Sequence, residues 1–241
     1  MILFVYALGL AQAKQNLFAP QKNKNNHLFL CQKALKLSKG ELFMPTLVIF
    51  AGVNGTGKTT LYQKQCKNLF LGERVNPDEI LIQFGGDWRS KYDIVKSSLI
   101  ALKKIDELFK LKKSFNWETT IVSNTLLNKL SIAKKLGYKI CLQFVGVDNV
   151  KTAISRVNKR VFNGGHGISP QKIEERFLKQ FNDLDKVLEF VDYAIFFDNT
   201  NKTKIVAKYK NGSFTNVDKS TSWINDFIQI QKNKNTALDL S

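Results

Sequence analysis

The sequence predicts an α/β fold in three layers, in which a mainly parallel sheet is covered by helices on both faces. Short, continuous apolar runs, typical of buried parallel strands, alternate with longer segments whose apolar residues recur at helical spacing. The 241 residues, 44% of them hydrophobic, suffice for one such domain with a sizeable core. No apolar run reaches the roughly 20 residues that cross a bilayer, so no membrane partner is expected.

The strands are expected where apolar residues run together, at residues 46–50, 115–121, 139–147 and 193–197. A hairpin across Asn211-Gly212 is expected to add strands at 205–209 and 213–217. Helices are expected at 58–69, 90–112, 124–136, 150–161, from Ser169-Pro170 onward, and at 223–230. Residues 73–87 are polar and are expected to connect two elements. The C-terminal hairpin and helix complete the predicted fold.

The ends of the chain are expected to lie outside this domain. Residues 1–43 contain an apolar stretch and then a segment rich in Asn, Gln and Lys, and the first strand begins directly after Met44. We therefore treat 1–43 as an N-terminal extension and Met44 as an alternative translation start, which N-terminal peptide mass spectrometry would test. Residues 44–231 form the predicted domain and 232–241 a predicted tail.

The net charge is +17, which could indicate a nucleic-acid or anionic-membrane partner. The lysines are spread along the chain, however, which favours solvated helix faces over one basic binding block. Three cysteines, Cys31, Cys66 and Cys141, form no CxxC pair, which argues against a disulfide framework or a cysteine metal site and fits a reducing cytoplasm. Cys66 and Cys141 are expected to be small core residues.

A phosphate-binding loop is predicted at residues 52–59, between the first strand and the first helix. Its sequence, Gly52-Val53-Asn54-Gly55-Thr56-Gly57-Lys58-Thr59, fits the pattern G-x-x-x-x-G-K-[ST]. The glycines allow successive backbone N–H groups to face phosphate oxygens, and the following helix adds its positive end. Lys58 is expected to reach the β- and γ-phosphates, and the Thr59 hydroxyl to bind Mg²⁺. The fold class is therefore that of P-loop NTPases and kinases.

Two acidic residues are candidates for the chemistry of a kinase. Asp78 lies twenty positions after Lys58, where its carboxylate could accept the proton of an acceptor hydroxyl. The alternative is that Asp78 caps a helix. Glu118 comes at the end of a predicted strand, where open α/β sheets bind ligands, and could contact the substrate. The alternative is a solvated acid at a strand end.

A basic helix followed by glycines could form a lid over the phosphates. Arg156 and Arg160 lie one turn apart on one helix face, just before Gly164-Gly165-His166. Two guanidinium groups beside a glycine hinge suit a phosphate clamp, although charged surface residues on an exposed helix would give the same pattern. His166 could contact phosphate or cap the turn.

Taken in order, these motifs resemble those of the zeta-toxin family of P-loop kinases. The resemblance runs from about residue 46 to residue 199. It rests on the phosphate loop with Ala51 and Thr60, Asn76-Pro77-Asp78-Glu79-Ile80, Glu118-Thr119-Thr120, Arg156-Val157, Arg160-Val161, Gly164-Gly165-His166, Ile173 to Arg176, and Phe197-Asp198-Asn199.

The resemblance implies a toxin of a toxin–antitoxin pair, which phosphorylates a hydroxyl of UDP-N-acetylglucosamine with ATP or GTP in the cytoplasm. It gives Asp78 the role of base and Glu118 a place near the sugar. It makes Arg156, Arg160 and Arg176 candidates for stabilising the transferred phosphoryl group. The residues expected to bind nucleotide are 52–60, and those expected to bind the acceptor are Glu118, Thr119, Thr120, His166 and Arg176. A small antitoxin protein is the expected partner.

Two other classes of function stay open at this point. A nucleic-acid-directed enzyme, such as a polynucleotide kinase, would use the positive charge and bind oligonucleotides with a steep dependence on salt. No RNA- or DNA-reading module is recognisable, which makes nucleic acid the less expected partner. A P-loop ATPase or nucleotide switch that is not a toxin would hydrolyse nucleotide without an acceptor.

Overall fold

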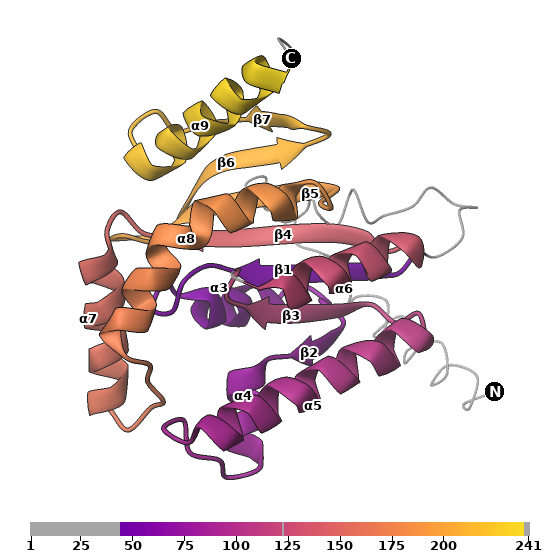
Figure 1. The fold of residues 1–241 in the computed structure, drawn as a ribbon, viewed down its shortest axis with the longest axis vertical. Coiled ribbons are helices and arrows are strands. Elements are labelled where there is room, and N and C mark those ends of the chain that lie inside the picture. The colour runs from indigo at the N-terminus through magenta and orange to yellow at the C-terminus, as the bar shows by residue number, and fades with distance from the viewer. Residues whose placement is uncertain (1–43, 122, 239–241) are drawn as a thin grey trace, which may run out of the picture. The chain divides into compact units, whose positions relative to one another are not determined.

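The structure is a computed structural model, and it describes residues 44–121 and 123–238. The predicted N-terminal extension, residues 1–43 with Cys31, lies outside these residues. The alternative start, Met44, is the first residue described. Within the described residues, the predicted α/β architecture is confirmed: a seven-stranded, mainly parallel sheet is combined with seven helices (Figure 1).

The sheet has the strand order β2-β3-β1-β4-β5-β6-β7. Its parallel part consists of β2 (Glu73–Val75), β3 (Phe115–Thr119), β1 (Thr46–Ala51), β4 (Lys139–Gly146) and β5 (Tyr193–Asp198). The predicted hairpin, β6 (Lys204–Lys210) and β7 (Ser213–Thr215), adds the antiparallel edge. Every residue of β1 is buried, as its continuous apolar run predicts for a strand covered on both faces.

Helices cover the two faces of the sheet unequally in the described part of the chain. Apolar side chains of α5 (Lys91–Lys110), α6 (Asn124–Lys135), α8 (Pro170–Leu188) and α9 (Ser222–Leu238) form one large core with one face. Leu47 and Ile49 of β1 point into that core. On the other face, Tyr62 of α3 (Lys58–Cys66) packs its ring edge-on against Phe50. α7 (Val150–Phe162) packs with α8 in a second, smaller core that also includes Val53 of the phosphate loop.

The segment 73–87, predicted to be a polar connection, holds two regular elements. It forms the edge strand β2 and the short helix α4 (Pro77–Gln83). A three-residue strand is too short for an alternating pattern to be visible in the sequence. Asn76 caps α4, since its side chain accepts a hydrogen bond from the Asp78 N–H at 3.0 Å, and Pro77 takes the first position.

Two helix boundaries differ from the prediction. α3 ends at Cys66 and not near residue 69. Cys66 is exposed, whereas Cys141 is buried in β4 as expected. The expectation of a core position for Cys66 was therefore wrong. α9 continues beyond residue 230 to Leu238, into the segment predicted to be a tail.

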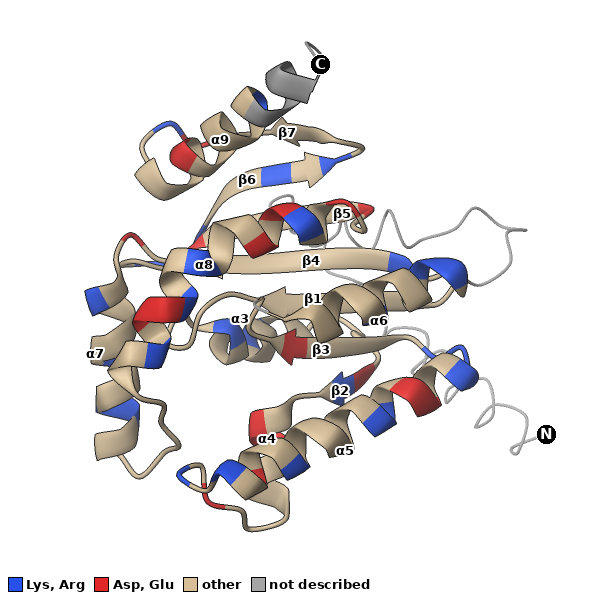
Figure 2. Ribbon diagram, in the orientation of Figure 1, with Lys and Arg blue, Asp and Glu red and all other residues tan. Residues whose placement is uncertain are grey.

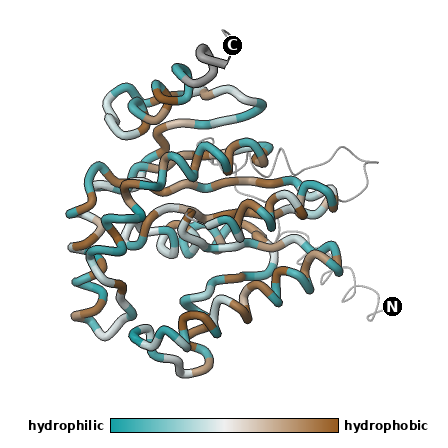
Figure 3. Tube along the Cα trace, in the orientation of Figure 1, coloured by the Kyte–Doolittle hydropathy of each residue, from teal (hydrophilic) through white to brown (hydrophobic). Residues whose placement is uncertain are grey.

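Charged residues are dispersed over the elements of the domain, and apolar residues concentrate in its central sheet. In the view of Figure 2, Lys and Arg are spread over many helices and strands, in keeping with their even spacing in the sequence. Brown, apolar trace concentrates in the central strands, while the helices alternate between apolar and polar residues (Figure 3). Among the residues described, no helix is long and apolar enough to cross a membrane.

Candidate active site

The phosphate loop connects β1 to α3 in the described domain, with its glycines in conformations that other residues rarely adopt. Gly52, Gly55 and Gly57 have φ values of 139°, 85° and 99°. A Cβ at Gly52 would lie 2.2 Å from the carbonyl oxygen of Val145, and one at Gly55 would lie 2.2 Å from that of Ala153. The loop therefore needs glycine both for its turn and because β4 and α7 pack directly against its backbone.

Lys58 and its neighbours hold the loop in a closed ring. Lys58 Nζ donates to the carbonyl of Val53 at 3.1 Å, and Thr56 Oγ1 donates to the same carbonyl at 2.9 Å. Asn199, in the turn after β5, donates from Nδ2 to the carbonyl of Thr56 at 2.7 Å. Burial lowers the pKa of Lys58, and the nearby carboxylates of Glu118 and Asp78 oppose that effect without cancelling it.

Glu118 is buried and already bonded through both carboxylate oxygens. Thr59 Oγ1 donates to Oε1 at 2.7 Å, and Arg74 Nη2 donates to Oε2 at 2.5 Å. The side chain of Glu118 is only 7% exposed, so the alternative of a solvated strand-end acid does not describe this residue. Because Mg²⁺ prefers oxygen ligands and takes few from protein, the Thr59 hydroxyl beside this carboxylate has the chemistry to hold one.

Arg74 belongs to this hydrogen-bonded cluster, although no motif in the sequence singles it out. Its guanidinium bonds Glu79, Asn116 and Glu118, and it stacks 3.7 Å from the ring centre of Tyr62. Burial lowers the pKa of Arg74, but the hydrogen bonds and charges of the two glutamates outweigh it and raise the pKa overall. A lone arginine before Asn-Pro carries no motif, and only the sheet brings it to Glu118.

Asp78 of α4 points its carboxylate at His166, which lies in the loop between α7 and α8. Asp78 Oδ2 lies 2.7 Å from His166 Nε2, although 88 positions separate the two residues in the chain. Since Asn76 caps the helix with its side chain, the capping alternative for Asp78 is not what the structure has. Burial raises the pKa of Asp78, but the hydrogen bond and charge of His166, with Lys58 and Arg160, lower it overall.

The three candidate arginines occupy different positions. Arg176 of α8 donates from Nη1 to Asn54 Oδ1 in the phosphate loop at 2.7 Å. Arg160 donates from Nε to the carbonyl of His166 at 2.7 Å, and its buried Nη2 has no partner in the described residues. Burial lowers the pKa of both arginines, and the charge of Asp78 opposes this. Arg156 lies apart, donating to the carbonyl of Thr200 at 2.8 Å.

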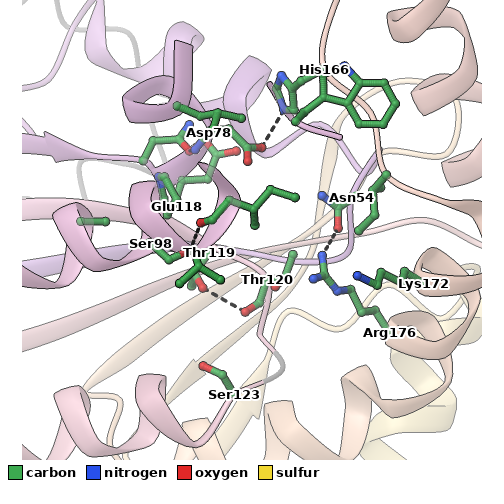
Figure 4. Close-up of a pocket in the computed structure, with 18 of the residues that line it drawn as sticks. Asn54, Asp78, Ser98, Glu118, Thr119, Thr120, Ser123, His166, Lys172 and Arg176 are labelled. Carbon is green, nitrogen blue, oxygen red and sulfur yellow. Dashed lines mark hydrogen bonds and ion pairs between the residues drawn. The ribbon is translucent and has the colours of Figure 1, made fainter. Parts of the chain in front are cut away.

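A cavity of about 810 Å³ joins these groups beside the phosphate loop. Figure 4 shows Asp78 and His166 at one side, Glu118 and Thr119 of β3 with the adjoining Thr120 at another, and Arg176 with Lys172 from α8 opposite them. Apolar side chains close the remaining wall. Trp117 comes from β3, and the others come from α4, α5 and the segment between them: Leu81, Trp88, Ile94, Val95 and Leu102. Thr60, by contrast, is exposed on α3 and does not line the cavity.

The structure thus gathers predicted site residues from several separate segments around one space. Those that line the cavity are Asn54, Lys58, Asp78, Glu118, Thr119, Thr120, His166 and Arg176. Arg160 supports its rim through His166, whereas Arg156 and the remaining residues of 52–60 do not belong to the lining. Lys172 and Trp88 line it without having been singled out, because neither sits in a recognisable motif.

The profile of the AAA domain family AAA_33 matches residues 47–184, more than half of the chain. The chain belongs to this family. The matched residues of this AAA domain hold the phosphate loop, Asp78, Glu118, His166 and the three candidate arginines. An uncharacterized protein of Haemophilus influenzae is 24% identical over 132 residues, covering 54% of this chain and 91% of its own.

Several solved structures share the fold of this AAA_33 chain. The complex of AvrRxo1-ORF1 and -ORF2 with ATP matches with a TM-score of 0.59 and 17% identity, over 76% of this chain and 63% of that one. A chain of the PezAT chromosomal toxin–antitoxin system of Streptococcus pneumoniae matches at 0.51 and 14%, over 88% and 94%. One from the Pnkp1/Rnl/Hen1 RNA repair complex matches at 0.51 and 21%, over 61% and 48%. The chain thus has a P-loop kinase-like fold and spans less than two thirds of the AvrRxo1 chains.

Proposed function

We propose that this AAA_33 chain is a kinase that transfers the γ-phosphoryl group of ATP or GTP to a hydroxyl of a small-molecule acceptor. One observation carries the proposal: a carboxylate with a lowered pKa, Asp78, faces the same cavity as Lys58 and Arg176. A kinase needs a proton acceptor near the acceptor hydroxyl and cationic groups near the γ-phosphate, and these three residues supply both.

We propose that the phosphoryl group is transferred in line between the acceptor oxygen and the leaving nucleoside diphosphate. The acceptor oxygen forms a bond to the γ-phosphorus while the bond from that phosphorus to the β–γ bridging oxygen breaks, and a nucleoside diphosphate leaves. The hydroxyl proton passes to the carboxylate of Asp78, which is ionised at neutral pH because its pKa is lowered. Lys58 and Arg176, with the unpartnered Nη2 of Arg160, carry the positive charge that stabilises the transferring group.

Mg²⁺ supplies charge neutralisation on the β- and γ-phosphates in enzymes of this fold. The Thr59 hydroxyl would hold the ion, and Glu118 would accept from its bound water, since Glu118 already lies 2.7 Å from Thr59 Oγ1. Glu118 is thereby proposed to serve the metal side of the site as well as the acceptor side, where Thr119 and Thr120 offer hydroxyl groups.

The acceptor to test first is UDP-N-acetylglucosamine, on the strength of the resemblance to zeta toxins. The cavity of about 810 Å³ falls in the range of small-molecule sites. Its wall offers tryptophan and aliphatic side chains for a planar or apolar group, and Lys172, Arg89 and Lys91 for an anionic one. A small antitoxin protein is proposed as the partner, because one fold relative comes from a toxin–antitoxin system.

The test is release of ADP by the purified full chain, with and without acceptor, and with the phosphorylated product confirmed by mass spectrometry. We expect ADP release to require UDP-N-acetylglucosamine or a related nucleotide sugar, and Asp78→Asn to remove it. The control is Lys179→Gln, a change of an exposed residue of α8 that does not line the cavity. Release without any acceptor would indicate an ATPase, and release only with a 5′-hydroxyl oligonucleotide would indicate a polynucleotide kinase.

A further inference from the structure

The loop between α7 and α8 reaches across the cavity to α4, and His166 is its point of contact. His166 Nε2 lies 2.7 Å from Asp78 Oδ2, and its side chain is 19% exposed while that of Asp78 is 46% exposed. Asp78 Oδ1 has no hydrogen-bond partner among the residues that the structure describes. One carboxylate oxygen is therefore held by the loop, and the other faces a cavity large enough for an acceptor.

The loop is shaped to keep His166 at this place. Arg160 of α7 donates from Nε to the His166 carbonyl at 2.7 Å, which holds the backbone of the residue. A Cβ at Gly167 would lie 2.6 Å from Val161 Cγ2 and 2.9 Å from Trp88 Cη2, so this glycine lets the loop pack between α7 and Trp88. The backbone position from which His166 contacts Asp78 is therefore set by a packed loop.

The direction of the hydrogen bond follows from the charge of Asp78. Its pKa is lowered, so the carboxylate is ionised at neutral pH and can only accept hydrogen bonds. His166 Nε2 must therefore carry the proton and donate it. The other charges that face Asp78 come from three elements: Lys58 at the start of α3, Arg160 of α7 and Arg176 of α8.

We propose that His166 is a positioning residue for Asp78: the closed α7–α8 loop fixes one carboxylate oxygen and leaves the other directed at the acceptor hydroxyl. This inference rests on the proposed function, because it assigns His166 a part in the same phosphoryl transfer. It couples loop closure to the chemistry, since the base is oriented only when the loop lies over the cavity. An unoriented carboxylate would accept the hydroxyl proton in a misaligned geometry, which lowers the rate without weakening nucleotide binding.

The experiment compares His166→Ala, His166→Gln and the control Asn163→Ala in the full chain. Asn163 is exposed at the end of α7, four residues before Gly167, which packs on Trp88. We expect His166→Ala to lower kcat about tenfold to a hundredfold with the KM for ATP changed by less than about twofold. His166→Gln should recover most of the rate, because its amide can donate to Asp78. Asn163→Ala should match the unchanged chain.

The pH profile separates orientation from general damage to the fold. Removing His166 removes a hydrogen bond that lowers the pKa of Asp78, so the acidic limb of kcat/KM should move to higher pH in His166→Ala. His166→Gln should move it less. A structural defect elsewhere would lower the rate without moving this limb.

A second measurement tests the contact without requiring catalysis. The chain has two histidines, and the spectrum of His166→Gln identifies which imidazole ¹⁵N resonances belong to His166. We expect Asp78→Asn to shift the resonances of His166. Unshifted His166 resonances would show that the pair is not formed and would overturn the inference.

The two proposals fail in different ways. A His166→Ala variant that transfers phosphate as fast as the wild type, or faster, would overturn the role of His166 and leave the kinase assignment standing. A wild-type chain that transfers phosphate to no acceptor, yet shows the His166 shift on Asp78→Asn, would overturn the kinase assignment while confirming the contact.

Discussion

The cluster around Arg74 should make this residue one of the most costly to replace outside the hydrophobic core. Arg74 is 13% exposed and Glu118 is 7% exposed, and their hydrogen bond links β2 to β3 and, through Thr59, to the phosphate loop. Asn116 accepts a further hydrogen bond from Arg74 at 3.1 Å. Replacing Arg74 with methionine keeps most of the apolar stem but leaves Glu118 buried without its cation.

The expected magnitude follows from that uncompensated charge. Removing one partner of a buried ion pair typically costs about 3–5 kcal/mol, because the remaining charge stays desolvated. Both side chains here are nearly inaccessible, so screening by solvent reduces this little. For a domain of this size the loss corresponds to a drop in melting temperature of roughly 6–20 °C. Glu79 is 38% exposed and should contribute little of it.

Urea denaturation of Arg74→Met, Glu118→Gln and the double variant, run as a double-mutant cycle, measures this. We expect the double variant to be more stable than the sum of the single losses predicts, by about 1–3 kcal/mol. The matched control is Lys113→Met, which removes an exposed pair with Glu73 and should cost less than about 1 kcal/mol. An Arg74→Met loss as small as that of the control would refute the reasoning that Glu118 is a desolvated charge.

Three further predictions concern the site. Lys58→Met should lower turnover about 10²–10³-fold while leaving the melting temperature nearly unchanged. Steady-state ADP release and thermal melts measure the two quantities, and intact turnover would contradict the role of Lys58 at the phosphates. Gly55→Ala should cost about 1–3 kcal/mol more in urea than Gly137→Ala, because both have positive φ but only Gly55 abuts a backbone oxygen, that of Ala153; equal losses would contradict the packing argument. Because the pKa of Asp78 is lowered, its ionised form stabilises the fold above its unfolded pKa of about 4, and this advantage disappears as the pH falls through the lower folded pKa. Asp78→Asn should therefore melt lower than the wild type at pH 7, the difference should shrink as the pH falls below about 4, and a constant difference would count against the shift.

The parts of the fold that sequence could predict are those whose signal is local. The run from Leu47 to Ala51 is apolar throughout and is buried throughout, and Ser169-Pro170 opens α8 as expected. The strand β2 could not be predicted in this way, because three residues carry no periodicity and its pairing with β3 is decided elsewhere in the chain. The end of α3 was placed too late for a similar reason: Asn68 and Leu69 suit a helix as well as a turn.

The same division runs through the site. The phosphate loop was predicted residue by residue, because its function requires a contiguous pattern. Asp78 and Glu118 were found from their positions after helix and strand, but their partners were not. Arg74 and His166 reach them across the fold, and no spacing in the sequence encodes a contact over 44 or 88 positions.

The glycines of the phosphate loop serve two purposes that mutation alone does not separate. Their backbone conformations suit phosphate binding, yet a Cβ at Gly52, Gly55 or Gly57 would also strike Val145, Ala153 or Asn199. These three contacts belong to β4, α7 and the turn after β5, so the loop is shaped by the packed domain around it. A glycine variant loses nucleotide affinity if its new Cβ displaces the loop, whereas a Lys58 variant adds no such clash and removes one hydrogen bond, that to the Val53 carbonyl. Nucleotide affinity in glycine variants therefore has to be compared at matched stability before any loss is assigned to the phosphates.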